Sequence, residues 1–411
     1  MKASDNAQQK KMLKQPLSGI RVLDIATFQA APLAATILGE FGAEVIKIEQ
    51  PDGGDPLRQY GTLDPCGDSY LWLSEARNKK SITLNLREPE GVTLFKKMVA
   101  KADVVTENFR PGTLEKWGLG YETLRGINPG IVMLRISAYG QTGPNKDLPG
   151  FARVAHAFSG VSYQTGDSDR PPASPGIAGL GDYLSGVYGA LGVMMALRAR
   201  EVNDGIGQFV DIGLYEPIFR MMDELAPAYA KTGQVRERMG ADIAIACPHS
   251  HYPTQDGKWV AIACSSDKMF ERLAAAMGKP EMAVDHRYAK AHARIERRDH
   301  MNELVSTWTS AQTQSEVLAV CEAFDVPCGP VHSIADIFND PQYAARENLL
   351  QLVNTRAGDV VLPGILPILS ETPGQFSHVG PALGEHSVAV YAELLDLSMT
   401  ELKTLREKGV I

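Results

Sequence analysis

The fold is decided by the stretch Ile20-Arg-Val-Leu-Asp-Ile-Ala26, the small-residue run from Ala30 to Phe41, and Ala43-Glu-Val-Ile-Lys-Ile48. The two outer runs are short and apolar, which is typical of buried strands. The middle run has Pro32 near its start, where a proline favours the first turn of a helix. A strand, a helix and a second strand in this order predict a βαβ unit with both strands parallel in one sheet.

The alternation of strands and helices continues along the chain. Further strands are expected at 81–86, 103–106 and 131–136, with helices at 89–101 and 113–126 between them. This pattern predicts an α/β fold with a Rossmann-like parallel sheet, whose ligands bind at the carboxyl ends of the strands. Polar loops follow the first, second, fourth and fifth strands at 27–32, 49–54, 107–112 and 137–144.

The length of 411 residues exceeds what one hydrophobic core usually serves, so two domains are expected. We predict a flexible N-terminal tail (1–16), the first part of a large domain (17–232), a smaller α+β domain (233–335) and a C-terminal segment that returns to the large domain (336–411). Hydrophobic residues make up 44% of the chain and charged residues 22%, as in ordinary globular enzymes. A net charge of −8 argues against nucleic acid or an anionic membrane as a partner.

Cysteine usage points to a reducing compartment. The five cysteines are scattered, and no two have CxxC spacing: Cys66, Cys247, Cys264, Cys321 and Cys328. We therefore expect a cytoplasmic protein with free thiols. Residues 1–16 are polar and lack the apolar core of a signal peptide, and no uncharged apolar run is long enough to cross a bilayer.

Common cofactor and nucleophile motifs are missing. No GxGxxG follows the first strand, and the chain has no P-loop, no GxSxG and no HExxH. His249 and His251 could offer two imidazoles to a metal, but no third ligand is indicated. We expect no metal and no permanently bound cofactor.

Asp182 stands out within Gly179-Leu-Gly-Asp-Tyr-Leu-Ser-Gly186, just before the apolar run 188–197. The pattern places it at or near the start of a buried helix, where an aspartate commonly serves as an N-cap. The neighbouring glycines also leave room for a ligand, and the helix dipole favours the ionised carboxylate. A nucleophile or general base is the second interpretation, and the residues alone leave both open.

Several motifs, in order and spacing, carry a family resemblance that runs from Leu17 to the C-terminus. They are Leu17-Ser-Gly-Ile-Arg-Val-Leu-Asp24, Phe41-Gly-Ala-Glu-Val-Ile-Lys-Ile-Glu49, Arg77-Asn-Lys-Lys-Ser81, Glu107-Asn-Phe-Arg-Pro-Gly112, Tyr139-Gly-Gln-Thr-Gly-Pro144, Gly181-Asp182, Asp325-Val-Pro-Cys-Gly-Pro-Val331 and Leu383-Gly-Glu-His386. The sequence resembles the family III CoA-transferases, which include formyl-CoA transferase and carnitine CoA-transferase, and the related alpha-methylacyl-CoA racemases.

The resemblance implies that Asp182 is the catalytic nucleophile, with Gln29 as a second catalytic residue. In the family mechanism the carboxylate attacks a donor acyl-CoA, which gives an aspartyl anhydride and then an aspartyl-CoA thioester. The acceptor acid reverses these steps, so coenzyme A is a substrate rather than a resident cofactor. The family also implies an interlocked homodimer.

The resemblance further implies a set of CoA contacts: Ala30, Arg77, Asn78, Lys79, Asn108, Phe109, Arg110, Lys116 and Tyr139. Gln50 departs from formyl-CoA transferase, which has an arginine there. Residues 236–253 hold no glycine run like the loop that closes that enzyme's active site. Formate and oxalate are therefore poor substrate candidates.

A racemase is the alternative activity, and an idle binding protein of the same fold is a third. Racemase relatives place a histidine after the glycine that matches Gly150, whereas this chain has Phe151, which cannot transfer a proton. The intact Asp182 disfavours an idle protein.

Arg153 bears on the substrate. The run 150–160 looks like that of relatives acting on succinyl-CoA and a second diacid. We expect a succinyl-CoA donor and a short dicarboxylic or sulfino acid as acceptor, with Arg153 binding the second anionic group. The plain alternative is an exposed arginine whose stem packs on the surface.

Overall fold

The computed structural model describes residues 13–411, and most of the predicted N-terminal tail (1–16) lies outside them. The chain divides into two compact units. The first unit holds residues 13–161, 175–227 and 347–411, and the second holds 162–174 and 228–346.

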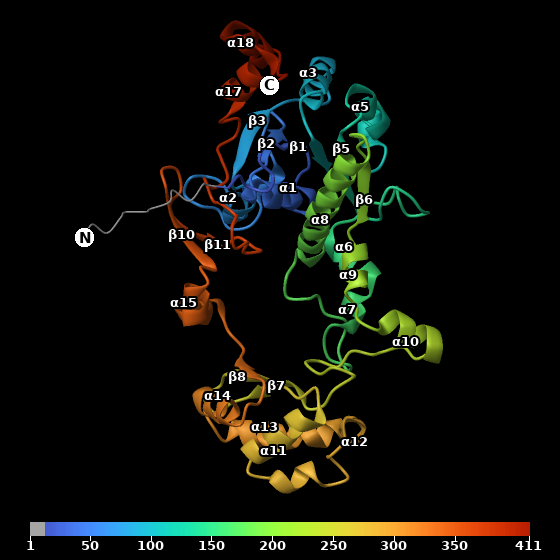
Figure 1. Ribbon diagram of the computed structural model, residues 1–411, viewed down its shortest axis with the longest axis vertical. Helices are drawn as coiled ribbons and strands as arrows, with labels where there is room; N and C mark the ends of the chain where they lie inside the picture. Colours follow the sequence, from blue (N-terminus) through green and yellow to red (C-terminus); the bar gives the residue numbers. More distant parts are fainter. Residues whose placement is uncertain (1–12) are drawn as a thin grey trace, which may run out of the picture. The chain divides into compact units, whose positions relative to one another are not determined.

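The first unit is built on a six-stranded sheet with the order β3-β2-β1-β4-β5-β6 (Figure 1). Its strands are β1 (Arg21–Asp24), β2 (Glu44–Glu49), β3 (Lys79–Thr83), β4 (Val104–Glu107), β5 (Val132–Ser137) and β6 (Phe209–Gly213). All neighbouring strands pair in parallel. The predicted α/β fold with a parallel sheet is confirmed.

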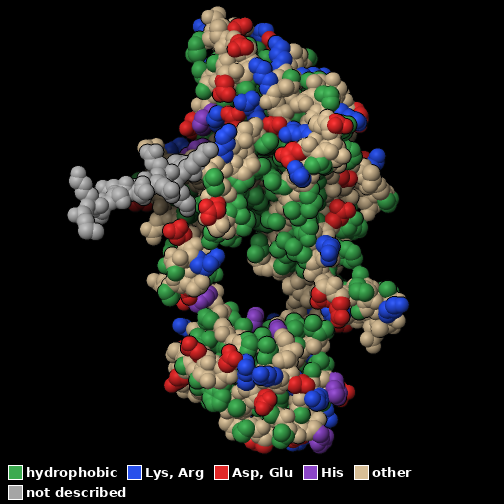
Figure 2. Space-filling view, in the orientation of Figure 1, with side chains coloured by type: hydrophobic (Ala, Val, Ile, Leu, Met, Phe, Trp, Pro, Cys, Tyr) green, Lys and Arg blue, Asp and Glu red, His purple; other side chains and the backbone are tan. Residues whose placement is uncertain are grey.

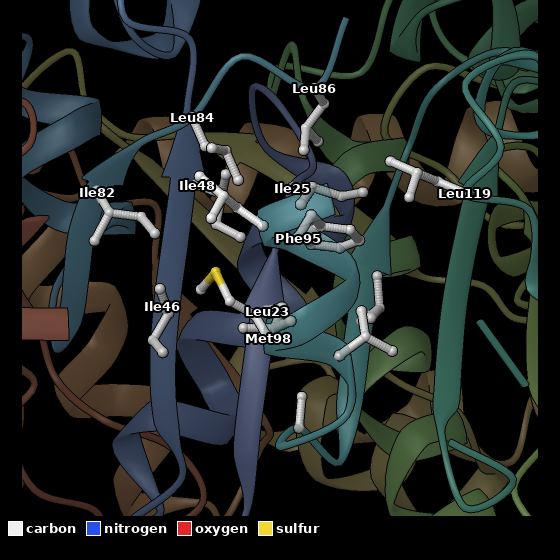
Figure 3. Packing of buried hydrophobic residues seen from close by; sticks show 14 of the residues in the cluster. Leu23, Ile25, Ile46, Ile48, Ile82, Leu84, Leu86, Phe95, Met98 and Leu119 are labelled. Atoms are coloured by element: carbon white, nitrogen blue, oxygen red, sulfur yellow. The ribbon is translucent and has the colours of Figure 1, made fainter. Parts of the chain in front are cut away.

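Alternate residues of each strand belong to two different hydrophobic cores, because successive side chains of a strand point to opposite faces of the sheet. On one face Leu23 and Ile46 pack with Phe95 of α3 (Pro89–Val99), together with residues of α5 (Tyr121–Ile127), α17 (Ser387–Leu395) and α18 (Met399–Glu407). Figure 3 shows Phe95 and Met98 against this side of the sheet. The C-terminal helices therefore complete the core of the first unit.

On the other face Val22 and Val45 pack with α1 (Ala30–Glu40) and α8 (Leu180–Val202). A Cβ at Gly186 would lie 2.8 Å from the backbone oxygen of Ala30, and one at Gly189 would lie 2.9 Å from Leu134. These glycines let α8 lie close against α1 and β5. The prediction that Gly186 opens space before Asp182 is therefore wrong, since this position faces α1.

One predicted long helix, 113–126, is wrong, and the stretch 215–232 is divided in a similar way. The stretch 113–126 forms α4 (Thr113–Lys116) and α5, because Gly118 between them has φ +68° and breaks the helix. The stretch 215–232 forms α9 (Glu216–Arg220) and α10 (Leu225–Thr232), and Asp223 between them has φ +36°. The smaller elements include η1 (Pro56–Gln59), α2 (Tyr70–Glu75), α6 (Ala152–Ser159), α7 (Val161–Gln164) and the antiparallel pair β10 (Leu349–Asn354) and β11 (Gly358–Pro363).

The second unit has a small antiparallel sheet with the order β7-β8-β9. Its elements are β7 (His249–Pro253), β8 (Trp259–Ala263), α11 (Asp267–Ala276), η2 (Pro280–Ala283), α12 (Ala291–Glu296), α13 (Arg298–Ser310), α14 (Gln314–Ala323), β9 (Cys328–Pro330), α15 (Ile334–Asn339) and α16 (Pro341–Ala345). Val260, Phe270, Met301 and Val317 form its core. A smaller unit that mixes strands and helices is thus present.

One side of α8 is apolar and uncovered. Val187, Leu191, Met194 and Met195 follow each other at helical spacing and are 40–62% exposed. Figure 2 shows hydrophobic side chains gathered over this part of the first unit. By length and composition α8 is also the one helix among residues 13–411 that could cross a membrane, although its opposite face packs in the core, as the central helix of a globular domain does.

Candidate active site

A pocket of about 580 Å³ lies in the first unit, where β1, β4 and β5 end and α8 begins. Its size is typical of small-molecule sites. The lining residues are Thr27, Phe28, Gln29, Ala30, Tyr60, Asn108, Ile136, Ser137, Ala138, Gly150, Phe151, Ala152, Arg153, Ala178, Gly179, Asp182 and Leu214. The pocket thus gathers Gln29, Ala30, Asn108, Arg153 and Asp182 from the residues predicted by the sequence.

Asp182 is the third residue of α8, and the N-cap position belongs to Gly179, which offers no side chain. The N-cap interpretation of Asp182 is therefore wrong. Among the described residues no hydrogen bond or ion pair engages its carboxylate, and burial raises its pKa to about 6. Near neutral pH most of the carboxylate is ionised, so the pocket holds an unpaired and weakly solvated anion, which suits a nucleophile.

The first turn of α8 is held by a histidine from α6. Nε2 of His156 accepts a hydrogen bond from the backbone N–H of Gly181, at 3.1 Å. The ring is only 1% exposed, and burial, aided by Arg153, lowers its pKa. The imidazole therefore stays neutral with its proton on Nδ1, and Nε2 fixes the backbone directly before Asp182.

A hydrogen-bonded chain orients Gln29. Its Nε2 donates to the hydroxyl of Tyr183 at 3.3 Å, and that hydroxyl donates to Oε1 of Glu75 at 3.4 Å. Burial, with Glu75 beside it, raises the pKa of Tyr183, so the hydroxyl remains protonated. Because the Tyr183 hydroxyl donates its hydrogen bond to Glu75, its oxygen is left to accept the hydrogen bond from the Gln29 amide. This arrangement fixes the orientation of the Gln29 side chain.

Side-chain hydrogen bonds hold two consecutive residues of the loop between β1 and α1. The side-chain amide of Asn108 accepts from the backbone N–H of Thr27 at 2.8 Å and donates to its carbonyl at 2.6 Å. Asp55 accepts from the backbone N–H of Phe28 at 3.0 Å, and Phe28 adopts φ +60°, which is rare for a bulky residue. Asn108 therefore shapes the loop that carries Gln29, and its amide is already used by the protein.

Aromatic rings form one wall of the pocket. Phe28 makes edge contacts with Tyr60 and Phe151, with ring centroids 5.8 and 6.2 Å apart. Arg153, on the first turn of α6, is exposed and has no ion-pair partner among residues 13–411. An apolar wall and one free cation around an unpaired carboxylate suit an acid that is apolar in its middle and anionic at its far end.

A second pocket of about 300 Å³ lies at the ends of β1, β2 and β3, and Thr27 lines both pockets. Its lining residues are Ile25, Thr27, Lys47, Ile48, Glu49, Gln50, Asp52, Gly54, Asp55, Pro56, Leu84, Leu86, Arg87, Phe109 and Trp117. Phe109 and Trp117 meet edge to face at 5.3 Å, and Arg87 is exposed. This aromatic and partly cationic pocket extends the site away from Asp182.

Three predicted CoA contacts lie elsewhere and have other partners. The guanidinium of Arg77 donates to Glu40 at 2.7 Å, and the amide of Asn78 donates to the backbone of Gln375 at 2.6 Å. Nζ of Lys79 is 2.9 Å from Asp24, and Lys79 is 1% exposed. These residues stand at the amino end of β3, whereas the pockets lie at the carboxyl ends of the strands, so neither pocket includes them.

Tyr139 is also outside both pockets. Its ring packs against Phe158 and Tyr215, with centroids 5.0 and 6.3 Å away. Arg110 and Lys116 are exposed on the segment between Phe109 and Trp117, so they lie close in sequence to the second pocket without lining it.

Sequence reasoning missed Arg87, Trp117, His156 and the pair Tyr183 and Glu75. Arg87 follows directly on the predicted strand 81–86, so the strand-end rule would have found it had the loop after the third strand been included. His156 carries no such signal, because its partner is a backbone N–H far along the chain. Across residues 13–411, no group of three or more His, Cys, Asp and Glu side chains is placed to hold a metal ion.

Comparisons with known proteins connect the chain to one family. The family model described as CoA-transferase family III matches residues 17–387. The chain is 52% identical to the succinyl-CoA–L-malate CoA-transferase alpha subunit of Chloroflexus aurantiacus, over 96% of this chain and 92% of that protein. It is 42% identical to the succinyl-CoA–D-citramalate CoA-transferase of the same organism, over 97% and 98%. A crystal structure of a CAIB/BAIF family protein from Brucella suis superposes with a TM-score of 0.82 at 33% identity, over 93% of this chain and all of that one.

Proposed function

The chain belongs to the family III CoA-transferases, and from that membership we propose that it moves CoA from succinyl-CoA to a short dicarboxylic acid with Asp182 as the nucleophile. The observation that carries the proposal is the unpaired Asp182 carboxylate in a pocket that also contains Gln29 and Arg153. The names of the relatives support succinyl-CoA as the donor, because both relatives described above use it.

The proposed reaction requires no oxidant and no metal, and each step exchanges one acyl bond for another. An oxygen of Asp182 adds to the thioester carbonyl, the C–S bond breaks, and CoA leaves as the thiolate with the electron pair. The thiolate then attacks the aspartyl carbonyl of the anhydride and releases succinate. The acceptor carboxylate attacks the resulting aspartyl-CoA thioester, and the returning thiolate finally takes up the acceptor's acyl group and frees Asp182.

Water must stay out of this sequence, because it would hydrolyse the anhydride and the thioester. The aromatic wall of Phe28, Tyr60 and Phe151 supports this requirement. Gln29, held by Tyr183, is placed to donate its second amide hydrogen to a bound carbonyl.

We propose that CoA spans the two pockets. Thr27 belongs to both, so a ligand that passes this residue can enter the second pocket with one end and reach Asp182 with the other. Phe109 and Trp117 suit the adenine ring and Arg87 suits a phosphate. Arg87 thus takes the place of Arg77 and Lys79, which the resemblance gave as cationic CoA contacts.

For the acceptor we propose a four- or five-carbon diacid, with or without a 2-hydroxyl group. One carboxylate would react and the other would pair with Arg153, the free cation of the pocket. The named acceptors of the two Chloroflexus relatives, malate and citramalate, fit this description. Sulfino acids remain in the proposal as anions of similar size.

A homodimer is proposed on the exposed apolar side of α8, which a second copy can cover. The name of one relative describes an alpha subunit, so a second, related chain is the other outcome of the test. Light scattering of the purified chain distinguishes a dimer from a monomer that needs such a partner.

The function is tested by mixing the protein with succinyl-CoA and a panel of acids, followed by mass spectrometry of the CoA esters. The panel contains malate, citramalate, itaconate, glutarate, mesaconate, 3-sulfinopropionate, formate and carnitine. We expect new CoA esters from the diacids and none with Asp182→Asn. Arg153→Ala should raise the KM for the diacid at least tenfold and leave the KM for succinyl-CoA within a few-fold of the wild-type value. Arg153→Lys keeps the positive charge, so it should raise the KM for the diacid less. Failure of all eight acids would refute the proposal.

A further inference from the structure

Ser137 lines the Asp182 pocket and has a buried hydroxyl without a partner among the described residues. It is the last residue of β5, and it is 6% exposed. Its backbone carbonyl accepts from Leu214 at 2.9 Å, but its Oγ has no hydrogen-bond partner among the described residues. Buried hydroxyls are nearly always hydrogen-bonded in native proteins, so an unpaired one on a residue that lines the Asp182 pocket favours a partner supplied by a ligand.

Other buried hydroxyls of the same sheet show what is normal here. Oγ of Ser81 donates to Glu49 at 2.5 Å, and Oγ1 of Thr106 donates to Asp24 at 3.0 Å. Around Ser137, in contrast, the neighbouring pocket residues are apolar: Ile136, Ala138 and Leu214. The protein therefore offers this hydroxyl no acceptor on that wall of the pocket.

Ser137 and Asp182 line the pocket from different elements, the end of β5 and the first turn of α8. Helix α8 packs on β5 at Gly189, where a Cβ would lie 2.9 Å from Leu134. Asp182 lies about two turns earlier, roughly 10 Å along the helix axis, and so reaches past the end of β5 where Ser137 stands. An acyl group bound between these two elements would have the carboxylate on the helix side and the hydroxyl on the strand side.

We propose that the Ser137 hydroxyl donates a hydrogen bond to the carbonyl oxygen of the acyl group that Asp182 attacks, and to the oxyanion that forms there. This inference rests on the proposed CoA transfer. No bond to Ser137 forms or breaks, and its proton stays on Oγ while negative charge builds up on the substrate oxygen. A nucleophilic serine would need a base that accepts its proton, and none is bonded to it in the described chain.

The test compares Ser137→Ala with Ser185→Ala as its matched control. Ser185 is fully buried, its hydroxyl is likewise unpaired, and it stands on α8 one turn after Asp182 without lining the pocket. We expect Ser137→Ala to lower kcat by 10²- to 10³-fold, as the loss of one oxyanion donor does, with the KM for succinyl-CoA changed less than threefold. Ser185→Ala should leave kcat within threefold.

Ser137→Cys keeps the size of the side chain and replaces the hydroxyl by a weak donor, so it separates hydrogen bonding from packing. Its kcat should fall nearly as far as that of Ser137→Ala, with an unchanged melting temperature. If kcat stays near the wild-type value in both Ser137 variants, or falls equally in Ser185→Ala, the assignment is overturned. If wild-type protein transfers no CoA at all, the proposed function fails instead, so the two failures are distinct.

Discussion

His156 and Gly181 are joined across 25 positions of sequence by one buried hydrogen bond, from the backbone N–H of Gly181 to Nε2 at 3.1 Å. A racemase would need a second base opposite Asp182. His156 is the one histidine of the segment 150–160, yet its Nε2 lone pair is occupied and the residue does not line the pocket. The structure thus makes His156 a positioning residue and supports transfer over racemisation.

Replacing His156 should affect catalysis according to whether the new side chain can accept a hydrogen bond. His156→Gln retains an acceptor, so we expect kcat within tenfold of wild type. His156→Met leaves the Gly181 N–H buried and unpaired, which costs about 1–3 kcal/mol and shifts the turn that carries Asp182. Its kcat should fall further than that of His156→Gln, with little change in the KM for succinyl-CoA. Equal kcat values in steady-state assays of the two variants would contradict this role.

The pH dependence of kcat/KM should show an acid limb near pH 6. Burial raises the pKa of Asp182 to about 6, and the protonated acid, which prevails below that pH, is not a nucleophile. Activity therefore falls about tenfold per pH unit below 6. Rates measured with succinyl-CoA from pH 4.5 to 8 check this expectation, and a rate that stays constant from pH 8 down to pH 5 would show that the carboxylate is well solvated in the working enzyme.

Asp182→Asn should abolish transfer and stabilise the fold above pH 6. The folded-state pKa is raised from 3.8 to about 6, so ionisation destabilises the folded protein by up to roughly 3 kcal/mol once both states are charged. As the pH falls from 6 towards the unfolded value of 3.8 this difference shrinks, and it disappears well below 3.8, where both states are protonated. Thermal melts at pH 8 and pH 4 measure the gain, which should be full at the first pH and only a small fraction of that at the second. If Asp182→Asn stabilised the protein equally at both pH values, the gain would come from packing and not from the lost charge.

Substitutions of Lys79 and Arg87 should have different effects, the first on stability and the second on CoA binding. Lys79→Met leaves the buried Asp24 with Lys47, 3.8 Å away, as its one remaining cation among the described residues, so we expect a loss of several kcal/mol in unfolding free energy. Arg87→Ala should raise the KM for succinyl-CoA at least fivefold with no change in the melting temperature, because Arg87 is exposed at the second pocket. If Lys79→Met instead raised the KM for succinyl-CoA and Arg87→Ala lowered the melting temperature, Lys79 would be the CoA contact that the resemblance implies.

The sequence predicts the parallel sheet because apolar strands and small-residue helices alternate from Ile20 onward. It also singles out Asp182, because the glycine-bounded motif precedes a long apolar run that forms α8. It does not distinguish cations that bind ligands from cations that pair inside the protein. Lys79 looks like a phosphate contact until its partner, Asp24, is known from the sheet register.

Intact-protein mass spectrometry after incubation with succinyl-CoA alone tests the central claim most directly. Without an acceptor acid, the account predicts a covalent CoA adduct that peptide mapping places on Asp182 and that malate discharges as a new CoA ester. Asp182→Asn should form no adduct. Wild-type turnover without any adduct on Asp182, or an adduct on another residue, would contradict the account.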